Sequence, residues 1–298
     1  MSAADQAART NNKLGALLTM LAMLCFAAMD AITKVLVVDY SVAQMMWIRY
    51  ALLCLFAAFI ARRRGVFTAL KTQRPWLQIF RSLVAVIEGA MFVLAFRYLP
   101  LADTHAVAAT APLIVIALGV FFLGERAGLA RWLAVAAGFA GVLLIVRPGF
   151  KEFDWPLLLP LVGSVLWAGY QILTRLVSRT DQPDTTMLWS AIVAFVVLSF
   201  FGPLDWQWPT ATVWALMIVI AAIGAGAHYA LIKALDYAEA GAVQPYSYSL
   251  LVWATLLGIF MFGDVPDGWT ILGATIVVAS GLYTWNHDRR ANNAAPAA

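Results

Sequence analysis

Charged residues are scarce in this chain of 298 residues, at 12% of the sequence, whereas apolar residues make up 63%. Soluble domains typically contain about 25% charged and about 45–50% apolar residues. A chain this apolar cannot cover its surface with polar side chains, so we predict that lipid solvates much of it. This composition excludes a soluble catalytic domain, and we expect no nucleic-acid partner.

Other absences exclude further classes of protein. The sequence contains no G-x-x-x-x-G-K motif and no H-E-x-x-H motif, and its three histidines, His105, His228 and His287, are scattered. A fused ATPase and a zinc protease are therefore disfavoured, and we expect no cofactor and no bound metal. The two cysteines, Cys25 and Cys54, lie in apolar runs, which indicates buried thiols rather than a disulfide.

Apolar stretches recur along the chain at nearly regular spacing, separated by short polar breaks. Because each stretch must satisfy its own backbone hydrogen bonds in lipid, we predict an all-α membrane protein with ten transmembrane helices. The first stretch has no convincing cleavage site, so we interpret it as a retained span rather than a signal peptide. The ten predicted spans are 14–38, 42–61, 76–96, 104–123, 132–146, 156–177, 185–201, 211–232, 242–262 and 269–285.

The lysines and arginines predict the orientation of these spans. If the N-terminus is cytoplasmic, fourteen basic residues lie on the inside and only Arg97, Arg147 and Lys151 lie outside. This is a strong positive-inside bias, and it places both termini on the cytoplasmic side of the membrane. We expect this membrane to be a bacterial inner membrane. The inside residues are Arg9, Lys13, Arg62, Arg63, Arg64, Lys71, Arg74, Arg126, Arg131, Arg175, Arg179, Lys233, Arg289 and Arg290.

The two halves of the chain resemble each other. Residues 26–34 align with 167–175 at an offset of 141, and residues 119–125 align with 258–264 at an offset of 139. Each half contains five predicted spans, an odd number, so the second half should be inverted relative to the first. Inverted repeats are typical of secondary transporters, which bind substrate between the halves near the middle of the membrane. We expect tails at 1–13 and 287–298 and repeats at 14–149 and 150–286.

These features carry a family resemblance. The pattern [Phe/Trp]-x-x-x-[Asp/Gln]-x-x-Thr-[Lys/Arg] in the first span of each half, together with Pro112 and the following Gly124-Glu125-Arg126, resembles the EamA type of the drug/metabolite transporter superfamily. The resemblance implies an exporter or exchanger of small metabolites, with a cavity lined mainly by the first, third, fourth, sixth, eighth and ninth spans. It favours the amino-acid exporter branch. In the second half the expected proline aligns with Leu251 instead, while Pro245 lies earlier.

Ionisable residues inside the spans are candidates for the substrate pathway, because charge is costly in lipid. Glu88 lies near the middle of span 76–96 and could bind a substrate amine, carry a proton or pair with another helix. Asp30 and Lys34 have the spacing of an ion pair within one helix, which remains compatible with exposure of Asp30 to a cavity. His228 follows Gly224-Ala225-Gly226, which we interpret as a break in its span, and could titrate during transport or form a hydrogen bond across helices.

Two helical faces combine aromatic and polar residues. In span 156–177, Trp167 and Tyr170 share a face, with Gln171 beside them. In span 242–262, Gln244 and Tyr248 lie on one face. We expect such faces to point inward, where aromatic rings would stack on flat apolar groups. Interfacial aromatic belts are the alternative interpretation of such residues.

The remaining residues have simpler interpretations. Pro112 and Pro245 interrupt helical hydrogen bonding within spans and are candidate hinges, with static kinks as the simpler alternative. His105 is interpreted as a loop or capping residue near the outer face. Small residues in the fifth and tenth spans allow close helix packing. They are Ala134, Gly138, Gly141, Gly273, Ala274 and Gly281.

We therefore predict a secondary transporter that exports small metabolites by alternating access, with neutral or aromatic amino acids as the expected substrates. The expected partners are the small-molecule substrate, the lipid bilayer and protons as a candidate coupling ion. A multidrug or other metabolite exporter of the same fold is the main alternative. A channel is the alternative from a different class, although no segment resembles a selectivity filter.

Overall fold

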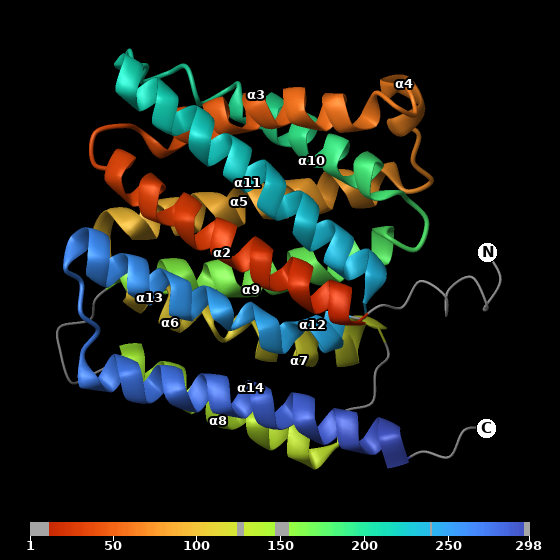
Figure 1. Ribbon diagram of the computed structural model, residues 1–298, viewed down its shortest axis with the longest axis vertical. Coiled ribbons are helices and arrows are strands. Elements are labelled where there is room, and N and C mark those ends of the chain that lie inside the picture. The colour runs from red at the N-terminus through yellow and green to blue at the C-terminus, as the bar shows by residue number, and fades with distance from the viewer. Residues whose placement is uncertain (1–11, 124–127, 147–154, 239, 295–298) are drawn as a thin grey trace.

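The computed structural model describes residues 12–123, 128–146, 155–238 and 240–294, and all regular secondary structure in this part is helical (Figure 1). Seven of the described helical segments are long and apolar enough to cross a membrane, while the helices at 132–146 and 183–198 are apolar but shorter. The predicted all-helical architecture is confirmed.

The helices of the first half are α2 (Asn12–Leu36), α3 (Val42–Ala61), α4 (Val66–Ala69), α5 (Pro75–Tyr98), α6 (Leu101–Ala108), α7 (Ala111–Leu123) and α8 (Leu129–Val146). Those of the second half are the 3-10 turn η1 (Trp155–Leu157), α9 (Leu158–Val177), α10 (Pro183–Leu198), α11 (Ala211–Tyr237), α12 (Ala240–Ser247), α13 (Ser249–Phe262) and α14 (Gly268–Ala294).

The helix ends follow from local sequence. The Ser41 side chain accepts a hydrogen bond from the Gln44 N–H at 3.2 Å and caps α3, and Thr210 caps α11 in the same way. Proline stands at the start of α5 and α10, where its missing N–H costs no helical hydrogen bond. Helix α13 ends at Gly263, whose φ of 70° is accessible to glycine at little steric cost.

The helices pack in pairs that a pseudo-two-fold relation between the halves explains. Helix α2 packs on α11 and α13, and its counterpart α9 packs on α5 and α7. Helix α3 packs on α11, and its counterpart α10 packs on α5. The equivalent helices α3 and α10 pack on each other, and so do α8 and α14. The alignment of the two halves in the sequence therefore corresponds to a symmetry of the packing.

The helices of the second half run in the opposite direction to their counterparts in the first half. Helix α2 begins, and α14 ends, at the right of Figure 1, which we call the terminal face. Helix α2 ends at the other end of the bundle, which we call the distal face, beside the α13–α14 connection. Helix α9, the counterpart of α2, ends at the terminal face beside the C-terminus of α11.

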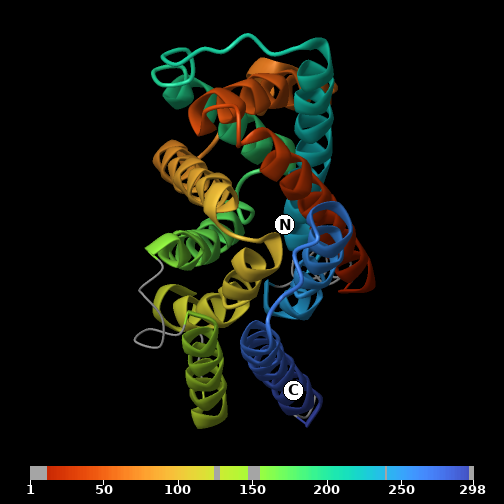
Figure 2. The ribbon, with the colours of Figure 1, turned by 90° about the vertical axis from the view of Figure 1, so that its left-hand side faces the viewer.

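Helices α8 and α14 form a pair at one edge of the molecule and pack mainly on each other (Figure 2). Their backbones touch at two glycines: a Cβ atom built on Gly141 would lie 2.7 Å from the carbonyl oxygen of Gly273. Gly138 likewise leaves no room for a Cβ beside Leu113. The small residues of these spans therefore permit close approach, as predicted.

The fourth and ninth spans are each broken at equivalent positions. The first break, at 109–110, separates α6 from α7, and the second, at Tyr248, separates α12 from α13. The Thr110 hydroxyl donates to Val107 O at 2.7 Å, and the Ser249 hydroxyl donates to Tyr246 O at 2.7 Å, at an offset of 139 residues. The second break thus forms although Leu251 replaces the expected proline.

The predicted break at Gly224-Ala225-Gly226 is wrong, because α11 is continuous from Ala211 to Tyr237. Gly224 instead allows α2 to approach, since a Cβ atom built there would lie 2.7 Å from the Met29 sulfur. The glycine is explained by packing between α2 and α11 rather than by helix breaking.

Candidate functional site

A cavity of about 90 Å³ lies between the two repeats. The resemblance implied lining by six spans, and the structure adds the second span, because Arg49 and Tyr50 of α3 also line the cavity. Its volume is well below the ~300 Å³ at which small-molecule pockets begin. The repeats would have to separate around this cavity to admit a metabolite.

The first repeat supplies four ionisable groups to the cavity wall: Asp30 from α2, Arg49 from α3, Glu88 from α5 and His105 from α6. Glu88 lies within electrostatic range of both Arg49 and Asp30. The Arg49 guanidinium contacts the Met29 sulfur at 3.8 Å and lies 5.1 Å from the centre of the Tyr50 ring. Arg49 was missed in the sequence because a lone arginine in a span shows neither its face nor its neighbours.

The predicted ion pair between Asp30 and Lys34 is wrong. Lys34 Nζ instead binds Asp264 Oδ2 at 2.7 Å and donates to the Leu99 carbonyl at 3.1 Å. Leu99 caps the C-terminus of α5, where the helix dipole attracts a cation. Asp30 turns the other way, and its Oδ2 lies 3.3 Å from His105 Nε2.

The interpretation of His105 as a loop or capping residue is also wrong. His105 lies within α6, is only 3% exposed and lines the cavity. The helix that carries this residue, α6, ends at the break at 109–110. The equivalent position in the second repeat, at the offset of 139, is Gln244. Two polar residues at matching positions of an inverted repeat are the signal that could have identified His105.

Both repeats supply aromatic groups to the cavity wall. Trp167 of α9 and His228 of α11 line the cavity and both contact the Phe26 ring edge-on, with ring centres 5.9 Å and 4.9 Å apart. Phe92 of α5 also lines the cavity and packs against Gly163 of α9, where a Cβ atom would lie 2.8 Å from the ring. Trp167 thus faces the cavity, as expected for its helical face, and the role of His228 in the substrate pathway stays a prediction.

The other predicted pathway residues lie outside the main cavity. Tyr170 stacks on Trp167 at 5.5 Å but is buried against Arg81, and Gln171 is 2% exposed and does not line the cavity. Tyr248 lines a smaller adjoining chamber of about 30 Å³. The side chain of Gln244 lies outside the described residues. Pro112 lies in the first turn of α7, and Pro245 lies inside α12. Both are therefore near the helix breaks, and their role as hinges stays a prediction.

Arg81 is a second residue that the sequence did not reveal. It is fully buried in α5 and donates to Gln78 Oε1 at 3.2 Å, to the Thr186 carbonyl at 2.8 Å and to Ser190 Oγ at 2.6 Å. Its guanidinium also lies 5.2 Å from the centre of the Tyr170 ring. These contacts join α5 to α9 and α10, which suits a structural cation satisfied by neutral acceptors.

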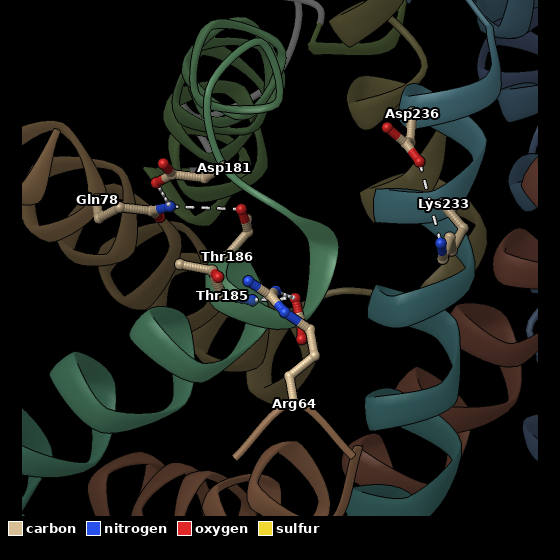
Figure 3. Close-up of polar contacts among 8 residues, drawn as sticks. Arg64, Gln78, Asp181, Thr185, Thr186, Lys233 and Asp236 are labelled. Atoms are coloured by element: carbon tan, nitrogen blue, oxygen red, sulfur yellow. Dashed lines mark hydrogen bonds and ion pairs between the residues drawn. The ribbon is translucent and has the colours of Figure 1, made fainter. Parts of the chain in front are cut away.

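Polar contacts join the two repeats at the terminal face (Figure 3). Arg64 forms an ion pair with Asp184, and Asp181 accepts a hydrogen bond from Gln78. Asp181 also accepts a hydrogen bond from the Thr72 hydroxyl. Figure 3 also shows the pair between Lys233 and Asp236, which lies within α11 and joins no helices.

The distal face is joined in a related way. Lys34 connects the first repeat to Asp264 of the second, and the Gln44 amide exchanges hydrogen bonds with the backbone of Gln207. Arg175, the counterpart of Lys34, donates to the carbonyls at the C-terminus of α11, just as Lys34 donates at the C-terminus of α5. The repeats are therefore held together on both sides of the cavity.

Comparisons with known proteins agree with this architecture. The EamA-like transporter family matches residues 13–147 and 154–285. A riboflavin transporter of Rhizobium johnstonii is 29% identical over 93% of this chain and 92% of its own length. A riboflavin transporter of Vibrio cholerae is 30% identical over 90% of this chain and 92% of its own. An S-adenosylmethionine uptake transporter of Rickettsia conorii is 27% identical over 75% of this chain and 76% of its own.

A solved crystal structure has a similar fold. It superposes with a TM-score of 0.66 at 19% sequence identity, covering 93% of this chain and 98% of the solved chain. This likeness concerns the fold alone.

Proposed function

Because the chain belongs to the EamA-like transporter family, and is therefore an integral membrane transporter of small metabolites rather than an enzyme, we propose that its substrate is riboflavin or a closely similar flavin. Two riboflavin transporters align with nearly the whole chain. The expected amino-acid substrate finds no support in these relatives, and the alternative of another metabolite carried by the same fold fits them better.

The chemistry of the cavity carries this proposal. A flavin has a flat, uncharged tricyclic ring, a pyrimidine edge with donors and acceptors, and a chain of hydroxyl groups. Trp167 and Phe26 offer aromatic surface for stacking, while Asp30, Arg49 and His105 offer both donors and acceptors. A substrate that combines a flat apolar face with a polar edge suits this mixed lining.

Alternating access supplies the mechanism. The cavity lies between inverted repeats, and polar contacts join these repeats on both of its sides. Release of the contacts on one side at a time would open the cavity to that side while the other stays closed. We keep the cytoplasmic location of both termini as part of the proposal, on the strength of the distribution of basic residues.

S-Adenosylmethionine is the second candidate substrate. The cavity contains two carboxylates, Asp30 and Glu88, against a single arginine, Arg49. A sulfonium cation with an adenine ring could use both carboxylates and the aromatic wall. The relative from Rickettsia conorii is named for this substrate.

Counterflow in proteoliposomes tests the substrate. The purified full-length chain is loaded with unlabelled riboflavin and supplied with labelled riboflavin outside, with S-adenosylmethionine and tryptophan series in parallel. We expect saturable riboflavin counterflow that exceeds the flux of the other two. Flux of S-adenosylmethionine or tryptophan without riboflavin flux would refute the proposal, and an ohmic current would indicate a channel. Repeating the series with and without a pH gradient separates proton-coupled from facilitative transport.

A further inference from the structure

His105 is a buried polar residue whose hydrogen-bonding groups the fold leaves unused. It is 3% exposed, and neither ring nitrogen forms a hydrogen bond with any of the described residues. Nε2 lies 3.3 Å from Asp30 Oδ2, close enough for an ion pair but without hydrogen-bond geometry. Because an unpaired buried polar group destabilises the fold, such a group in a cavity wall points to a ligand.

The imidazole ring is held in a fixed orientation. It stacks on Phe92, with ring centres 6.3 Å apart and planes 12° from parallel, and it packs against Phe96 at 5.8 Å. A fixed ring presents its nitrogens in fixed directions, which is what selective recognition of a ligand requires.

His105 also stands where two spaces meet. It lines both the main cavity and the smaller chamber beside the α12–α13 break, and Trp167 lines both as well. A flat ligand stacked on Trp167 would therefore bring one of its edges to the imidazole.

We propose that His105 recognises an N–H group on the ring edge of the substrate. A neutral imidazole has one donor and one acceptor nitrogen, and a carboxylate beside one nitrogen favours the proton on that side. Because the negative charge of Asp30 lies near Nε2, we assign the proton to Nε2 and the role of acceptor to Nδ1. The ligand class is a heteroaromatic ring with an imide or amide N–H, such as the pyrimidine edge of a flavin. Asp30 acts as a positioning residue.

This inference rests on the proposed function, and a modified substrate tests it. Methylation of the N3 position of riboflavin removes the N–H that His105 would bind and leaves the ring and the ribityl chain in place. The probes are riboflavin and 3-methylriboflavin, and the readout is the ratio of their KM values for uptake into proteoliposomes that contain the full-length chain.

We expect the unmodified chain to have a KM about tenfold higher for 3-methylriboflavin than for riboflavin, as one lost hydrogen bond in a buried site would produce. His105→Phe retains an aromatic ring for packing on Phe92, and we expect its KM ratio to fall to about one through a weaker binding of riboflavin. His105→Asn retains a hydrogen-bonding group and should restore part of the KM ratio. This second variant also tests the inference if His105→Phe fails to fold.

His228→Phe is the matched control, because it replaces the other histidine of the same cavity. It should change transport of both probes alike and leave their KM ratio as in the unmodified chain. A ratio of about one in the unmodified chain, or an unchanged ratio in His105→Phe, would overturn the inference while riboflavin transport persists. Absence of riboflavin transport by the unmodified chain would instead refute the proposed function, and the inference with it.

Discussion

The ion pair between Lys34 and Asp264 should hold the distal face closed. It joins α2 of the first repeat to the segment between α13 and α14 of the second, with Nζ and Oδ2 2.7 Å apart. If the repeats separate at this face during transport, the pair must break. Replacing Lys34 by methionine removes the charge and keeps a similar apolar stem.

The expected magnitude follows from the burial of the pair. The side chains are 16% and 25% exposed, so the pair is neither fully buried nor at the surface. Exposed pairs contribute up to about 1 kcal/mol, and breaking a fully buried pair costs about 3–5 kcal/mol. A value of about 1.4 kcal/mol is reasonable for this position and corresponds to a tenfold shift of the open-to-closed equilibrium.

Labelling of a cavity cysteine measures this shift. Ala108 lines the cavity and can be replaced by cysteine after the free cysteines Cys25 and Cys54 are changed to alanine. In Lys34→Met, we expect a membrane-impermeant maleimide added at the distal face to label this cysteine about ten times faster. Labelling from the terminal face should not accelerate.

Lys233→Met provides the matched control. Lys233 pairs with Asp236 at 4.0 Å within one helix, and its side-chain exposure is 29%. Its replacement removes the same charge without separating the repeats, so distal labelling should not change. In a double-mutant cycle, Asp264→Asn should add little to Lys34→Met, because both remove one interaction. Unchanged distal labelling in Lys34→Met, or equal acceleration from both faces, would refute the reasoning.

Three further predictions concern stability and transport. Arg81→Met should lower the unfolding free energy by about 3 kcal/mol, because it removes several buried hydrogen bonds and leaves Gln78 Oε1 without its donor. Thermal unfolding in detergent measures this, and an unchanged Tm would contradict it. Gly141→Ala should destabilise the chain by about 1–3 kcal/mol in the same assay, since the new Cβ would lie 2.7 Å from the carbonyl oxygen of Gly273. An unchanged Tm would instead show that α8 and α14 can move apart. Glu88→Gln should alter substrate binding or the pH dependence of uptake, because Glu88 lines the cavity; unchanged KM, rate and pH profile would remove it from the site.

Hydropathy and spacing were sufficient to predict the helices and their repetition. The second span was predicted at 42–61, the bounds of α3, and the fourth at 104–123 against α6 and α7 together. Long apolar runs in lipid have no alternative to helix, so their type and approximate length follow from composition. The equivalence of the two breaks is a finding of the structure, because Leu251 gave no signal of it.

Side-chain partners could not be predicted in the same way. The spacing of Asp30 and Lys34 shows that they share a helical face, but it does not reveal competing groups on other helices. For Lys34, the carbonyl of Leu99 and the carboxylate of Asp264 are the stronger partners. Gly224 was misinterpreted for a similar reason, since its role depends on Met29 of another helix.

The two repeats have diverged in the chemistry that they present to the cavity. Asp30, Arg49 and Glu88 of the first repeat correspond, at offsets of 141, 141 and 139, to Gln171, Ser190 and Ala227 of the second. The second repeat contributes mainly Trp167, His228 and apolar groups instead.

This divergence constrains how a substrate can bind. Two identical repeats would offer a ligand two equivalent orientations, related by the pseudo-two-fold axis. Here only one orientation places a polar edge against Asp30, Arg49 and Glu88 of the first repeat. The same orientation must serve whichever face is open, because the lining residues belong to the repeats and not to the faces. Selectivity should therefore depend on which edge of a ring is polar, and isomers that differ only in the position of that edge should be transported unequally.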